Sequence, residues 1–153
     1  MRKLFAILLL LGTFSAFADA PASGRIVKTL PLLLDLNGHD AVSPSLFDRD
    51  AYQFYLRAHT NEISAVRYDV LWEAGVPAQS KLKIRVELHG TTADGKPLQK
   101  ILENEVKPSV SRHWASLTLG GEDYKQYGSA ITAWRVTLWA GDSLLSEQKS
   151  FLW

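Results

Sequence analysis

The stretch KLKIRVELH, residues 81–89, alternates without a break between apolar side chains and charged or polar ones. Leu82, Ile84, Val86 and Leu88 share one side of an extended chain, because successive side chains of a strand point to opposite faces. One buried and one solvated face is typical of an antiparallel sheet. The segment therefore predicts a half-exposed antiparallel strand, and it indicates a β fold.

Similar segments lie on both sides of this strand. Residues 66–73 alternate in the same way and bring Tyr68, Val70 and Trp72 to one face. The other expected strands are residues 25–36 with a break at Pro31, 97–106, 114–119, 130–139 and 144–152. About seven strands with frequent turns predict a mainly β fold, and the pattern resembles an antiparallel immunoglobulin-like or fibronectin-like β-sandwich.

In one segment the apolar residues recur about every four positions rather than every two. Ser45 is a suitable N-cap and Asp48, three residues later, completes a capping-box pattern, so residues 45–58 predict an α-helix inserted into the sandwich. One face of this helix is apolar. Its members are Phe47, Ala51, Phe54, Tyr55 and Ala58.

The beginning of the chain predicts export. Arg2 and Lys3 precede a short apolar run, and Ala16-Phe17-Ala18 offers small residues for cleavage, which is the pattern of a secretory signal peptide over residues 1–18. We expect a flexible linker at 19–24, a single domain at 25–153 and a periplasmic or extracellular location. No second apolar run is long enough to predict a transmembrane helix in the mature chain.

Composition excludes several kinds of partner and chemistry. Without Arg2 and Lys3 the chain has 15 basic and 16 acidic residues, a formal charge of −1. This balance does not favour binding to nucleic acid. The sequence contains no cysteine, which excludes disulfides, thiol catalysis and cysteine-ligated metals. One domain of this length can bury a core without such cross-links.

Catalytic and metal-binding motifs are not evident in the sequence. The four histidines are scattered, and no nucleophile elbow or glycine-rich phosphate loop occurs. Residues 35–40, DLNGHD, place oxygen-bearing side chains around Gly38, but an Asn-Gly turn explains them without a cation. We therefore assign no catalytic, cofactor-binding or metal-binding residue, and expect no cofactor.

The closing hairpin carries the candidate interaction surface. With a three-residue loop at 140–142, Trp139 pairs with Ser143 and Arg135 with Glu147, a favourable cross-strand pair. This register predicts an unusually apolar outer face, which is normally covered or functional. We expect either the 45–58 helix or a partner to cover it. The face consists of Ile131, Trp139, Leu145, Phe151 and Trp153.

The leading hypothesis is an exported, non-enzymatic β-sandwich that binds or assembles with a protein or another component of the envelope or the extracellular space. Two alternatives stay open. The terminal Phe151 and Trp153 also resemble the end of small outer-membrane β-barrels, although such barrels need at least eight strands. A hydrolase-like enzyme remains compatible with a site assembled from distant residues. The sequence fixes neither the partner nor the oligomeric state.

Overall fold

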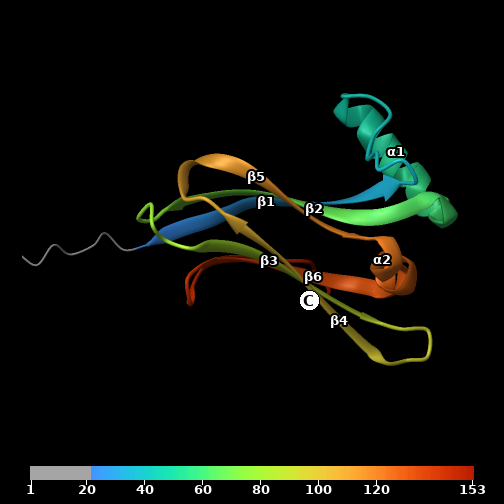
Figure 1. Cartoon of the computed structure of the whole chain (residues 1–153). Coiled ribbons are helices and arrows are strands. Elements are labelled where there is room, and N and C mark those ends of the chain that lie inside the picture. Colours follow the sequence, from blue (N-terminus) through green and yellow to red (C-terminus); the bar gives the residue numbers. More distant parts are fainter. Residues whose placement is uncertain (1–21) are drawn as a thin grey trace, which may run out of the picture.

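Seven antiparallel strands form two open sheets in the computed structural model, which describes residues 22–153 (Figure 1). The strands are β1 (Ser23–Asp35), β2 (Ile63–Gly75), β3 (Leu82–Thr91), β4 (Pro97–Val106), β5 (Ser109–Gly120), β6 (Ile131–Ala140) and β7 (Ser143–Lys149). The sheet orders are β1-β2-β5 and β4-β3-β6-β7. The predicted antiparallel β-sandwich is confirmed, whereas the predicted signal peptide lies outside the described residues.

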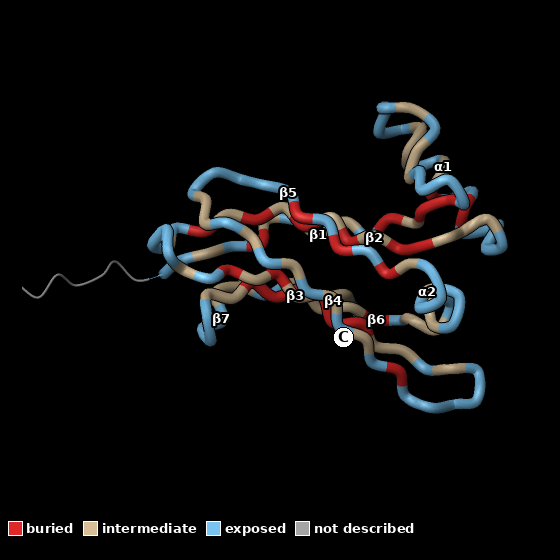
Figure 2. The backbone as a smooth tube through the Cα atoms, viewed as in Figure 1, coloured by how far each residue is buried: buried red, intermediate tan, exposed pale blue. Residues whose placement is uncertain are grey.

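The core fills the space between the two sheets. Side chains from the period-two segments of both sheets form one buried cluster, and buried positions occur along strands of both layers (Figure 2). Val70 of β2, Ile84 and Val86 of β3, and Val136 of β6 are fully buried. The alternation of apolar and polar residues, seen most clearly in residues 81–89, therefore determines which side of each sheet is buried.

The two sheets approach each other along one edge, where β7 lies beside β1. The backbone N–H of Ile26 donates to Ser146 Oγ at 3.1 Å. Gly24 of β1 leaves room for Leu145 of β7, since a Cβ on that glycine would lie 2.8 Å from Leu145 Cδ1. This contact joins the first and last strands of the described chain.

The predicted register of the closing hairpin is wrong. Ala140 pairs with Ser143 around a tight Gly141-Asp142 turn, and Gly141 has the positive φ of 56° that favours glycine there. A bulge at Leu145 then shifts the pairing, so that Arg135 lies opposite Lys149 rather than Glu147. An extra residue in one strand reverses the faces to which the following side chains point, and the alternation of residue types alone does not reveal such a bulge.

Two α-helices, α1 (Leu46–Ala58) and α2 (Gly121–Tyr127), and two short 3-10 helices, η1 (Thr60–Glu62) and η2 (Gly128–Ala130), connect the strands. Ser45 caps α1 as predicted and accepts from the backbone N–H of Asp48 at 3.4 Å. However, α1 lies on β1 of the three-stranded sheet (Figure 1), so the prediction that this helix covers the closing hairpin is wrong. No helix within residues 22–153 is long and apolar enough to span a membrane.

We predict that Gly90→Ala destabilises the fold. Gly90 pairs with Ile131 beside a second bulge, and a Cβ at this position would collide with the carbonyl oxygen of Ala130. Backbone cannot yield as a side chain does, so we expect a loss of about 1–3 kcal/mol, the range for overpacking. Urea denaturation measures the loss. Gly75→Ala, where the nearest atom is Ser23 Oγ at 3.3 Å, is the control, and an equal effect of the two variants would contradict this account.

Candidate interaction surfaces

The side-chain amide of Gln53 fixes α1 to the sandwich. Its Oε1 accepts from the backbone N–H of Leu33 at 2.8 Å, and its Nε2 donates to the carbonyl oxygens of Leu33 at 2.8 Å and Asp40 at 2.9 Å. The amide therefore pairs with β1 as a neighbouring strand would, and satisfies backbone groups on the free edge of the sheet. Gln53 is only 4% exposed, and Leu56, one turn later, is fully buried.

A second polar contact joins α1 to the end of β1. Tyr52 Oη donates to Asp35 Oδ2 at 2.8 Å, while Asp35 Oδ1 accepts from the backbone N–H groups of Asn37 and His39, both at 2.8 Å. The donation from His39, followed by those from Tyr52 and Asn37, lowers the pKa of Asp35 below its ordinary value despite burial. The same carboxylate raises the pKa of Tyr52 to about 12.

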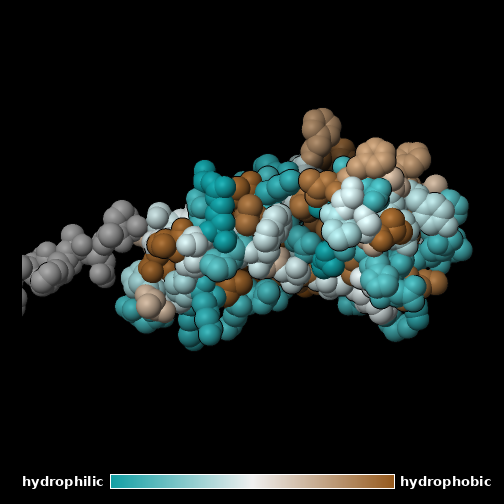
Figure 3. Space-filling model, turned by 90° about the horizontal axis from the view of Figure 1, so that it is seen from above, coloured by the Kyte–Doolittle hydropathy of each residue, from teal (hydrophilic) through white to brown (hydrophobic). Residues whose placement is uncertain are grey.

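These contacts turn the apolar side of α1 away from the protein. Phe47 is 80% exposed and Phe54 is 74% exposed, and Ala51 and Ala58 beside them are also exposed. We call Phe47, Ala51, Phe54 and Ala58 the α1 outer face. Figure 3, which looks down on the helix, shows hydrophobic surface gathered at this end of the molecule. The predicted apolar face of the helix exists, but it points to solvent instead of the sheet.

The chain end lies on the outer face of the four-stranded sheet. The backbone N–H of Ser150 donates to the Trp134 carbonyl, and the backbone N–H of Trp134 donates to Ser150 Oγ. The backbone N–H of Trp153 then donates to the Ser150 carbonyl, and this turn brings the last residue back over the strands. The Trp153 ring stacks on His89 at 4.0 Å between ring centroids, and the guanidinium of Arg135 lies 4.8 Å from its centre. Trp153 is therefore part of the folded sheet surface.

Beneath this indole lies an ion pair. Arg135 Nε donates to Glu87 Oε2 at 2.6 Å, and Glu87 is only 7% exposed. The contact with Glu87 raises the pKa of Arg135 further. Because a buried charge without its partner is costly, this pair and the ring above it stabilise one another.

The structure divides the five residues of the predicted interaction surface. Trp139 and Trp153 lie on the outer face of the four-stranded sheet, and Phe151 is fully exposed beside them. Ile131 and Leu145 instead pack against the core. The reasons differ. β6 gains a residue at Thr132, directly after Ile131, whereas the two-residue turn sets Leu144 opposite Trp139 and leaves Leu145 on the core side. Each of these one-residue shifts of register reverses the inside and outside positions that were predicted.

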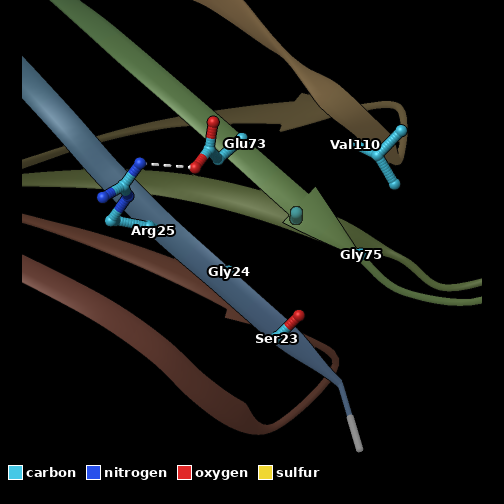
Figure 4. A pocket seen from close by; sticks show the side chains of 7 residues that line it. Ser23, Gly24, Arg25, Glu73, Gly75 and Val110 are labelled. Atoms are coloured by element: carbon cyan, nitrogen blue, oxygen red, sulfur yellow. Dashed lines mark hydrogen bonds and ion pairs between the residues drawn. The ribbon is translucent and has the colours of Figure 1, made fainter. Parts of the chain in front are cut away.

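A shallow hollow of about 390 Å³ lies where the start of β1 and the end of β2 meet the start of β5 (Figure 4). Arg25 Nη2 donates to Glu73 Oε1 at 2.7 Å, and Arg112 Nε reaches Glu73 Oε2 at 3.2 Å. Arg25 first, and then Arg112, lower the pKa of Glu73. A carboxylate held ionised between two guanidinium groups is poorly suited to acid catalysis.

The 35–40 loop is the Asn-Gly turn of the sequence analysis. Gly38 has a φ of 83° and donates to the Asp35 carbonyl, while Asp35 turns its carboxylate onto the loop's own backbone. Both carboxylate oxygens of Asp35 therefore accept hydrogen bonds from N–H or O–H donors of the protein. Between residues 22 and 153 no group of three or more histidine or acidic side chains is placed to hold a metal ion.

Asp50 and Arg57, two charged residues of α1, were not among the residues predicted to make contacts. The Asp50 side chain is 76% exposed and lies 3.6 Å from Arg49 Nη2, and Arg57 is exposed two helical turns later. Gln53 lies between them on the helix, three residues after Asp50 and four before Arg57, and it marks the side that bonds to β1.

We predict that the Asp35–Tyr52 contact weakens in alkali. A raised pKa in the folded state means that its stabilisation is complete below pH 10, the ordinary pKa of tyrosine, and is lost as the pH rises through about 12. Tyr52→Phe should lower the free energy of unfolding by about 1 kcal/mol at pH 8. Denaturation of both proteins at several pH values checks this. The difference should shrink towards pH 12, and a constant difference would count against the contact.

We further predict unequal roles for the two terminal aromatics. Trp153→Ala should lower the free energy of unfolding by about 1–2 kcal/mol, because it removes the stack on His89 and the cation–π contact with Arg135. Phe151→Ala should change it by less than about 0.5 kcal/mol, since the ring is fully exposed. Urea denaturation compares the variants, and similar losses would show that Trp153 contributes nothing specific.

Comparison with known proteins identifies the fold and no family. No family model matches the chain, and no curated protein matches it. A crystal structure of a protein from Akkermansia muciniphila is similar, with a TM-score of 0.53 over 87% of this chain and 73% of that chain, at 10% sequence identity. At such low identity the likeness concerns the fold alone, and it agrees with the β-sandwich.

Proposed function

We propose that this protein is an exported, non-enzymatic β-sandwich that binds or assembles with a protein of the cell envelope or the extracellular space, and that the α1 outer face is its contact surface. The observation that carries the proposal is the exposure of Phe47 and Phe54 at 80% and 74%. Exposed apolar patches on soluble domains commonly mark sites of association.

The fixed position of α1 supports this proposal. Gln53 and Leu56 are buried on the other side of the helix, and Gln53 makes three hydrogen bonds to backbone groups. Turning the aromatic side inward would break these bonds and leave buried backbone groups unsatisfied, which costs about 1–3 kcal/mol for each group. The phenylalanines are therefore held outward by the fold, as preorganised contact residues are.

Export is part of the same proposal and is supported by the sequence. The basic residues at positions 2 and 3, the short apolar run and the Ala16-Phe17-Ala18 sequence predict a secretory signal peptide. The absence of cysteine from the chain is compatible with an oxidising compartment, because no thiol is present to form an unwanted disulfide. We accordingly place the protein in the periplasm or outside the cell.

A photo-crosslinking experiment tests the proposed surface. Benzoylphenylalanine replaces Phe54 in cells that naturally make the protein, and irradiation should give a discrete covalent adduct with a protein, visible as a band of higher mass. The same amino acid in place of Trp114, an aromatic residue 53% exposed on β5, is the matched control and should give none. Equal labelling from both positions, or none from position 54, would overturn the proposal.

A further inference from the structure

The α1 outer face has the spacing of a coiled-coil seam. Phe47, Ala51, Phe54 and Ala58 follow one another at intervals of four, three and four residues. This is the repeat with which two helices interlock, each large side chain entering a hole on the facing helix. Large and small residues alternate along the seam, so each phenylalanine has an alanine as its neighbour.

The seam is complementary to itself when two copies run antiparallel. In that arrangement Phe47 lies opposite Ala58 of the second copy, and Ala51 lies opposite its Phe54. Every layer then combines one large with one small side chain, which fills space without overpacking. A parallel arrangement would set Phe47 against Phe47 and Ala51 against Ala51, and would alternate crowded with empty layers.

Charges beside the seam favour the same orientation. Asp50 and Arg57 are seven residues apart, so they lie on the same flank of the helix, two turns from each other. Antiparallel pairing brings identical flanks together and places Asp50 opposite Arg57 of the second copy. Twofold symmetry repeats this pair, so that the interface contains two opposite-charge contacts. Charges at such flanking positions set the orientation of paired helices.

We infer that the α1 outer face binds the same face of a second copy of this chain, with the two helices antiparallel and Asp50 of each copy opposite Arg57 of the other. The inference rests on the proposed function and names its partner. A membrane surface fits less well, because Asp48 and Asp50 balance Arg49 and Arg57 and leave the helix without net positive charge, whereas membrane-bound helices are rich in basic residues.

The expected contact between the two helices is small. A helix of 13 residues is ~20 Å long, so two such helices bury an area at the low end of specific interfaces, under about 1,200 Å² in total. We therefore expect a reversible dimer with a dissociation constant of about micromolar order, which separates on dilution.

Charge reversal tests the pairing with the purified exported protein. Sedimentation velocity over a range of concentrations should show a monomer–dimer equilibrium. Asp50→Arg and Arg57→Asp should each weaken dimerisation about tenfold, because two like-charge contacts replace two favourable ones. Lys107→Asp, an equal change of charge at an exposed position between β4 and β5, is the control and should leave the equilibrium unchanged. Unchanged thermal unfolding would verify that the variants fold.

The decisive measurement mixes the two charge variants. A chain with Asp50→Arg and a chain with Arg57→Asp, distinguished by mass, should form heterodimers about as stable as the original dimer, because both cross-contacts become favourable again. A protein that stays monomeric at all concentrations, or variants that fail to combine, would overturn the inference. If the photo-adduct from position 54 contains a different protein, the second-copy inference fails and the proposed function stands, whereas the absence of any adduct defeats both.

Discussion

The hydrogen bonds between the Gln53 amide and the backbone of β1 determine which side of α1 the protein presents to solvent. An amide can bond to the N–H and the carbonyl of Leu33 at once, as an adjoining strand would. Sheet edges need such protection, since their unpaired groups invite association with other strands. Here the Gln53 side chain protects the edge strand β1. As a consequence, α1 is attached to the sheet through the side of the helix that carries Gln53.

This attachment reverses the usual arrangement of a surface helix. Burying a phenylalanine fully contributes about 1.5–3 kcal/mol, so a helix with two of them would ordinarily turn them towards the protein. The sandwich offers no place for them at β1, where the α1 side is already filled by Leu56 and by the Gln53 contacts. The free energy of burying Phe47 and Phe54 therefore remains available for association.

Much of the fold was predictable because period-two alternation depends only on neighbouring residues. The strands predicted at 81–89 and 66–73, the Ser45 cap and the apolar face of the helix all followed from local patterns, and the structure extends these strands to 82–91 and 63–75. The bulges at Thr132 and Leu145 were not predictable, since they depend on contacts with strands distant in sequence. Nor could periodicity tell whether an apolar helix face points inward. That direction depends on Gln53 meeting Leu33, twenty residues earlier.

Two apolar surfaces, one on the helix and one on the closing hairpin, were expected to cover each other. The structure separates them, because different neighbouring residues fix the orientation of each surface. At the hairpin, the bulge at Thr132 and the two-residue turn direct Ile131 and Leu145 to the core, and Trp153 returns over Arg135 and His89 as part of the sheet surface. The chain end thus supplies the cover that the helix was expected to provide. Once the hairpin is covered in this way, it offers the helix no partner surface within residues 22–153, and the seam there either stays in water or meets another molecule. Its alternating large and small residues, with Asp50 and Arg57 on one flank, match a second copy better than they match a flat sheet.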